Sequence, residues 1–403
     1  MKAAGWIAAF FVAGAMAAPV ELTPAQRGED FDVAWRAVDK GYAYFARERA
    51  AWNRYRPAAR AKAVNARTRE DFVAALEGAL AILHDDHVRL SEGRLGSRIG
   101  IWARWQQGEA RVEAVRAFGD ADVAGLRPGQ RILRIDGAPV DKAVARRLQG
   151  HGPVDAAARD WALRHALSDL AARPLRIEVQ EGSGVRAVEV ERKAAPPANG
   201  PAIVARRIGE HRDLGYIRLK SGPAGEKVAD HFEGALHHLR DTRGLLVDLR
   251  DVPTEGSRAA TLAILGLFTA REKPWQLREL RGGKRVVDKV APSGVAPYGA
   301  PVLVLVDRWT AGEGEALAAG LVAVAGARLV GTRMAELRGE PRRIRLPHSG
   351  IVVSFPAERT LQLDGKPREI LAPHVEVDLS APSGGPGDPI LYRALKEMEK
   401  SAG

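Results

Sequence analysis

Apolar residues in the first part of the chain recur at the spacing of an α-helix. Within TREDFVAALEGALAIL, the residues Phe72, Leu76, Leu80 and Leu83 fall on one helical face. A threonine and an aspartate three residues apart at the start of this stretch match a helix N-terminal cap. The pattern predicts a helical N-terminal segment, which we place at residues 18–95.

Short strands and turns replace the helical pattern in the next part of the chain, residues 96–197. In AGLRPGQRILRIDGAPV, an apolar strand lies between a Pro-Gly turn and an Asp-Gly turn. Further on, apolar residues alternate on both sides of EGSG, which predicts a hairpin around residues 182–184. The stretch AAPPANGP, from Ala194 to Pro201, is rich in proline and glycine and is our predicted linker.

Continuous apolar runs alternate with amphipathic helices over residues 201–403. GLLVDLR and PVLVLVD are apolar throughout, as expected of strands in a parallel sheet with both faces covered. Ligand sites on such sheets lie beyond the carboxyl ends of the strands. The two segments that follow these runs, DLRDVPTEGS and DRWTAGEGE, are therefore the predicted location of a functional site.

The first residues have the composition of a secretory signal peptide. A lysine is followed by a short apolar run, and Ala15-Met16-Ala17 gives small residues at the spacing of a cleavage site. We predict a signal peptide over residues 1–17, a secreted or periplasmic protein, and no stable membrane span, because no apolar run reaches the required length.

Composition excludes several kinds of chemistry. The chain has no cysteine, which rules out a thiol nucleophile and a cysteine zinc site. Its net charge is +11, but the basic residues are scattered and no nucleic-acid motif accompanies them. We therefore expect a generally basic surface and no nucleic-acid partner.

The motifs occur together, and in the same order, in one family. LHDDH, GLRPGQRILRIDG, GLLVDLR, PVLVLVDRWTAGEGEALAAGL, LVGTRMA and GKPRE follow one another along the chain. In this the sequence resembles the serine peptidases of the tail-specific, C-terminal-processing and tricorn-core type. The resemblance implies a multidomain α/β fold in which the helical segment is followed by a PDZ-like, β-rich module over residues 96–197. A parallel-sheet α/β peptidase core of the crotonase-like (ClpP-like) type would then span residues 201–403.

The family's nucleophilic serine is missing. The pattern TGSMGEG aligns without gaps on residues 310–316, which places the serine position at Gly312. Glycine supplies neither a hydroxyl nor a thiol, although the backbone amide of Glu313 could still serve an oxyanion hole. A second oxyanion element would be a Gly-Gly pair that here reads Glu255-Gly256, and a carboxylate beside an oxyanion repels it.

The resemblance also proposes a base and a residue that orients it. His87 occupies the position of the tricorn-type histidine, and Glu369 in GKPREI is the candidate that orients it. The alternative interpretations are a turn cap for His87, a metal pair formed by HDDH, and a solvated charge for Glu369. A lysine base is absent, and Arg333 and Arg338 cannot replace one because guanidinium retains its proton.

Other hydroxyls could stand in for the missing serine. Four lie nearest by motif: Thr310, Ser257, Ser349 and Ser354. Thr310 is two residues from the serine position, so its side chain would need a rearranged turn.

Peptide capture does not need a nucleophile. In the PDZ mode a peptide adds as a strand, and a backbone nest holds its carboxylate. Ile99, Gly100 and Ile101 resemble that loop, or form an ordinary strand. We therefore expect either a catalytically inactive member that binds peptides and unfolded or C-terminal protein tails, or an active peptidase with a displaced nucleophile. No cofactor is expected. An acyl-CoA-type enzyme is a weak third alternative because no phosphate-binding loop is present.

Overall fold

The computed structural model covers the chain from residue 22 to residue 400 with gaps. The described ranges are 22–46, 48–93, 100–148, 154–168, 173–191, 201–220, 227–250, 252, 256–380 and 387–400. The predicted signal peptide lies outside these residues, as does the predicted linker apart from Pro201. No helix within them is long and apolar enough to cross a membrane.

The N-terminal part is helical, as predicted. Its elements are α1 (Pro24–Gly41), α2 (Glu48–Val64), α3 (Arg69–Leu80) and the 3-10 turn η1 (Ala81–Leu83). Thr68 and Asp71 form a reciprocal capping box at the start of α3, which satisfies amides that would otherwise lack partners. The helical run ends at His84, whose φ of 44° is left-handed.

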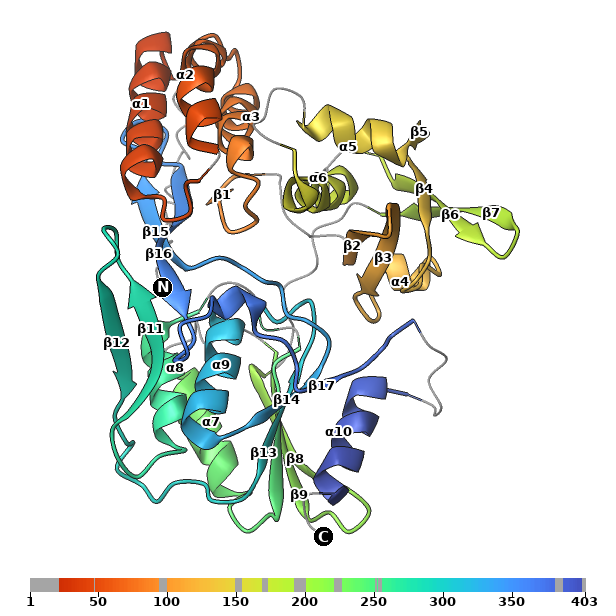
Figure 1. The fold of residues 1–403 in the computed structure, drawn as a ribbon, viewed down its shortest axis with the longest axis vertical. Coiled ribbons are helices and arrows are strands. Elements are labelled where there is room, and N and C mark those ends of the chain that lie inside the picture. Colours follow the sequence, from red (N-terminus) through yellow and green to blue (C-terminus); the bar gives the residue numbers. More distant parts are fainter. Residues whose placement is uncertain are drawn as a thin grey trace, which may run out of the picture.

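A hairpin from the C-terminal half completes the core of these helices. Strands β15 (Glu340–Arg345) and β16 (Val352–Leu361) are antiparallel, and β16 also pairs with β1 (Arg89–Leu90). Figure 1 shows these blue strands beside the red helices. The shared core contains Phe31, Trp35, Phe72, Leu346, Ile351, Val353 and Phe355. Next to this hairpin, β11 (Lys273–Glu279) pairs with both β16 and β12 (Arg285–Val290).

A β-rich module follows the helices and has its own hydrophobic core. The strand predicted between the Pro-Gly and Asp-Gly turns is present as β4, and the hairpin predicted around residues 182–184 is present as well. The elements of the module are β2 (Ile101–Gln106), β3 (Glu109–Val115), α4 (Asp120–Val123), β4 (Ile132–Ile135), β5 (Ala138–Pro139), α5 (Val140–Leu148), α6 (Ala156–Ser168), β6 (Leu175–Glu181) and β7 (Gly184–Val190).

The α/β domain is built on a sheet with strand order β17-β14-β13-β10-β9-β8, parallel except for β8. Helices α7 to α9 cover one face, and α10 packs on the other, as the two apolar clusters and Figure 1 show. This confirms the predicted multidomain α/β fold with a parallel core. The elements are β8 (Ile203–Ile208), β9 (Leu214–Leu219), α7 (Val228–His237), β10 (Gly244–Asp248), α8 (Arg258–Gly266), β13 (Val302–Val306), α9 (Glu313–Ala325), β14 (Arg328–Gly331), η2 (Arg368–Ile370), β17 (Val375–Glu376) and α10 (Pro389–Lys400).

Candidate functional site

The segments that follow β10 and β13 meet, as expected for neighbouring parallel strands. The Thr310 hydroxyl donates to the Leu249 carbonyl over 3.1 Å, and the Ala311 amide donates to the Val252 carbonyl over 3.2 Å. A cavity of about 160 Å³ lies beyond these strand ends. Its lining residues are His87, Gly256, Arg258, Gly312, Glu313, Gly339, Glu340, Pro341, Arg343 and Arg368.

Gly312 has a backbone conformation that other residues rarely adopt. Its φ is 54° and its ψ is −107°, and it is the residue immediately before α9. Its amide donates to Oε2 of Glu315 over 2.9 Å. At Gly312, the predicted serine position, the backbone therefore has a conformation that would be strained for other residues and that glycine tolerates.

The amide of Glu313 remains available to a ligand. Within the described residues no hydrogen bond involves this amide, and the Glu313 carboxylate points to Thr261, whose hydroxyl donates to it over 2.7 Å. Gly256, the other predicted oxyanion residue, is exposed and lines the same cavity. Glu255 lies outside the described residues. The predicted oxyanion positions that are described are therefore brought together.

Glu315 binds the backbone of the Gly312 turn through its carboxylate. Its side chain is buried and accepts from the amides of Gly312 and Leu337. Burial raises the pKa of this carboxyl to about 7, and the nearby Arg368 and the donated amides counteract part of that rise. The sequence gives this glutamate only as part of the family pattern, and its structural role emerges from its contacts.

His87 faces the cavity with one ring nitrogen. Nδ1 lies 2.6 Å from the Arg338 carbonyl, which can only accept, so Nδ1 carries the proton and Nε2 keeps its lone pair for the cavity. Burial lowers the pKa of His87 to about 3. The structure thus brings His87 and Gly312 together, with a neutral imidazole in the tautomer that a general base needs.

Glu369 is not the residue that orients His87. That contact is made by the Arg338 carbonyl, and Glu369 instead lies within electrostatic range of Arg338 and Tyr44. Its Oε2 is buried without a hydrogen-bond partner in the described part of the chain, and burial raises the pKa of its carboxyl. A backbone carbonyl leaves no trace in the side-chain sequence, which is why the motif alone pointed to the carboxylate.

The two aspartates before His87 each have a structural contact. Asp85 accepts from the Tyr42 hydroxyl and from the His87 amide, both over 2.8 Å. Asp86 pairs with Arg164 at 2.6 Å and with His165 at 3.0 Å, and Arg164 holds the pKa of Asp86 well below its usual range against the effect of burial. Among the residues described, no cluster of three or more His, Cys, Asp or Glu could hold a metal ion.

None of the substitute hydroxyls lines the cavity. Thr310 is fully buried and accepts from the Asp307 amide while donating to Leu249. Ser349 and Ser354 belong to the β15–β16 hairpin region, where the Ser349 backbone contacts the helical segment. Ser257 caps α8 and comes nearest, since it stands between two residues of the cavity lining.

The predicted peptide-binding loop is only partly described. Ile99 lies outside the described residues. Gly100 is buried with a φ of 70°, and its carbonyl accepts from the Arg116 amide. Ile101 is 1% exposed and belongs to the core of the β-rich module, as an ordinary strand residue does.

The outer edge of β2 is already occupied. The Trp105 amide donates to the Asp160 carboxylate of α6 over 2.7 Å, and Arg104 contacts the same carboxylate at 3.3 Å. The guanidinium of Arg159 lies over the Trp105 ring. A peptide strand that added here would have to displace Asp160 first.

The same turn that carries Gly312 also contacts the β-rich module. The Arg308 side chain is fully buried, donates to the Met334 carbonyl, and pairs with Glu113 at 2.6 Å. Trp309 packs edge-to-face against Trp102. The conformation of the turn is therefore fixed from outside the α/β domain as well as from within.

Comparison with known proteins agrees with this geometry. Residues 213–378 match the model of peptidase family S41, whereas no curated protein matches the chain. Among solved structures the chain is similar to a photosystem II D1 C-terminal processing protease, with 19% identity over 87% of this chain and 93% of that chain and a TM-score of 0.56. It is also similar to mature CPAF complexed with lactacystin, with 15% identity, coverage of 94% and 98%, and a TM-score of 0.58. The similarity to the tricorn protease has 17% identity, covers 94% of this chain and 37% of that chain, and has a TM-score of 0.50.

At these identities the solved structures establish the fold and leave the activity open. The matched family region contains the Gly312 turn and Glu369, whereas His87 comes from the helical segment before it. The chain thus has the fold of the C-terminal processing protease and of CPAF, and residues 213–378, most of its α/β domain, match peptidase family S41.

Proposed function

We propose that this chain is an exported, peptidase-fold protein that binds peptides or unfolded C-terminal protein tails without cleaving them. One observation carries the proposal. The cavity at the strand ends is lined by His87, Gly312 and Glu313, but no serine, threonine or cysteine is among its described lining residues. Acyl transfer needs a nucleophile within hydrogen-bond reach of the base, and this cavity supplies only the base and the amide.

The state of His87 also disfavours hydrolysis. A general base works best when its pKa is near the operating pH, and burial lowers the pKa of His87 to about 3. At neutral pH the imidazole is uncharged and accepts protons poorly. It is therefore a weak activator for water, the other nucleophile that could enter.

Binding of an extended peptide needs only a free strand edge and hydrogen-bonding groups. Within the described residues β15 pairs with β16 alone, so its other edge is open for strand addition. Glu340, Pro341 and Arg343 of β15 line the cavity. A peptide on this edge would reach the Glu313 amide, whereas the β2 edge is covered by Asp160.

The competing function is an active peptidase with Ser257 as nucleophile. One observation favours it: Gly256 and Arg258, the neighbours of Ser257, both line the cavity. Within the described residues the hydroxyl of Ser257 accepts a single, long hydrogen bond of 3.4 Å, from the Ala260 amide, so it could rotate toward the cavity.

The test compares cleavage, labelling and binding in one set of proteins. Purified protein and the variants Gly312→Ser, Ser257→Ala and His87→Ala are incubated with fluorescent casein, an unfolded protein, and with a fluorophosphonate probe. We expect the unmodified protein to bind casein without cutting it or reacting with the probe, and Gly312→Ser to react. Cleavage that disappears in Ser257→Ala would establish the competing function instead. Failure to bind unfolded protein would exclude the proposed one.

A further inference from the structure

Arg368 is a buried cation that forms no ion pair within the described residues. The residue is 3% exposed, and its side-chain atoms Nε and Nη1 have no hydrogen-bond partner within the described residues. Guanidinium keeps its charge in proteins, and an unpaired buried charge is strongly unfavourable. Because Arg368 lines the cavity beside Gly312, an anion that entered the cavity would relieve this cost.

The nearby carboxylates do not neutralise Arg368. Glu315, Glu340 and Glu369 all feel its positive charge, but none lies within ion-pair distance. Burial raises the pKa of all three carboxyls, and the positive charge of Arg368 counteracts part of that rise. Glu313, the fourth carboxylate of this region, is bound to Thr261.

Positive groups surround the remaining space. Arg343 lines the cavity and forms no ion pair within the described residues, while Arg258 is held by Asp288 at 2.6 Å. The amide of Glu313 opens α9, a helix of 13 residues whose N-terminal end favours negative charge. His87 presents a lone pair to the cavity and is not a donor there, so the amide and the guanidinium are the groups available to an anion.

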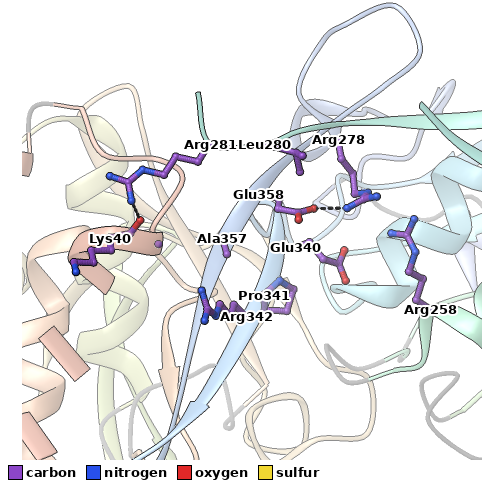
Figure 2. Close-up of a pocket in the computed structure, with 11 residues that line it drawn as sticks. Lys40, Arg258, Arg278, Leu280, Arg281, Glu340, Pro341, Arg342, Ala357 and Glu358 are labelled. Carbon is purple, nitrogen blue, oxygen red and sulfur yellow. Dashed lines mark hydrogen bonds and ion pairs between the residues drawn. The ribbon is translucent and has the colours of Figure 1, made fainter. Parts of the chain in front are cut away.

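The cavity adjoins a wider groove that is lined by several basic residues. The groove has a volume of about 570 Å³ and shares Arg258, Glu340 and Pro341 with the cavity. Figure 2 shows Arg258 and Arg278 gathered near Glu340, with Arg278 bound to Glu358. At the other side of the groove are Lys40, Arg281 and Arg342, none of which has an ion pair among the described residues.

We propose that the cavity binds the α-carboxylate at the C-terminal end of a peptide, through Arg368 and the Glu313 amide, while acidic side chains further up the peptide lie in the basic groove. This inference rests on the proposed peptide-binding function and adds the chemical class of the peptide. A carboxylate matches the planar donor fork of guanidinium. It also occupies the place where a peptidase would hold the carbonyl of the bond to be cut.

The test uses one peptide in two forms. A short peptide of Ala, Leu and Glu residues, with a fluorophore at its N-terminus, is prepared with a free C-terminal carboxylate and as the C-terminal amide. Fluorescence anisotropy then gives the affinity of each form for the intact chain. The amide cannot form the charge-assisted hydrogen bonds of the free carboxylate. We therefore expect the free acid to bind about tenfold or more tightly than the amide.

Two variants assign the effect to Arg368. In Arg368→Gln the preference for the free acid should disappear, while thermal stability without peptide should rise because a buried unpaired charge is removed. The control is Arg345→Gln, an exposed arginine at the end of β15 that does not line the cavity, and it should keep the preference.

Each result has a distinct meaning. Equal binding of the acid and the amide by the unmodified chain would overturn the carboxylate site and leave peptide binding intact. A preference that survives in Arg368→Gln would overturn the assignment to Arg368. Binding of neither form would contradict the proposed function together with this inference. The amide retains the glutamate side chains, so recognition of side-chain carboxylates alone appears as equal binding.

Discussion

Substituting serine for Gly312 tests the geometry of the turn before α9 directly. Gly312 has a φ of 54° and a ψ of −107°, a region that residues with a Cβ occupy at a cost of about 1–3 kcal/mol. A serine hydroxyl would add little stability as a helix cap here. Replacing a capping serine by glycine changes stability by only about a few tenths of a kcal/mol, and a capping residue needs an extended backbone. We therefore expect Gly312→Ser to lower the free energy of unfolding by about 1–3 kcal/mol.

Gly312→Ala is the matched control because it adds the Cβ without the hydroxyl. Urea unfolding of the three proteins should show that the two variants are destabilised by similar amounts. Only the serine variant should react with the fluorophosphonate probe, and addition of His87→Ala should suppress that reaction. If both variants are as stable as the unmodified protein to within about 0.5 kcal/mol, the turn does not have the conformation described here. If Gly312→Ser is stable and folded but unreactive, position 312 is not the nucleophile position.

Three further predictions concern stability and exchange. Because the folded-state pKa of Glu315 is raised to about 7, ionisation of this carboxyl opposes folding. Between about pH 5 and about pH 8 the protein should therefore lose about 2–3 kcal/mol of stability relative to Glu315→Gln, as measured by urea unfolding. The same dependence of stability on pH in both proteins would contradict this. Arg308→Met should destabilise the protein by about 3–5 kcal/mol because it removes a fully buried charge that pairs with both Glu113 and Glu336. Loss of the exposed pair in Arg127→Ala should change stability by less than about 1 kcal/mol, and equal effects of the two variants would refute the burial argument. Asp160→Ala should speed hydrogen–deuterium exchange at the Trp105 amide, and an unchanged rate would show that the β2 edge is protected by something else.

Apolar patterning was sufficient to predict the parallel sheet and the N-terminal helices. Runs such as PVLVLVD leave few alternatives to a buried strand, and the structure has β13 over Val302–Val306 with the Gly312 turn after it. The cavity brings Gly312, His87, Gly256 and Glu313 together, as the family pattern implied. The apolar runs and the short motifs were informative because each depends on residues that are close together in the sequence.

The remaining features depend on contacts that have no local signal. The acceptor on His87 is the carbonyl of Arg338, and any residue at that position offers the same group. Arg368 stands between a proline and a glutamate in a polar stretch typical of a protein surface, yet it is buried. Asp160 reaches the β2 edge only because α6 packs against that strand.

The hairpin that closes the helical segment has a consequence for how the chain folds during synthesis. The amide of His348 contacts the carboxylate of Asp30 across 318 positions of sequence. The N-terminal helices therefore leave the ribosome long before the strands that cover their apolar face. Long-range contacts of this kind form late and leave early segments exposed to chaperones. A nascent chain that stays incompletely folded for most of its translation would remain competent for threading through a translocation channel.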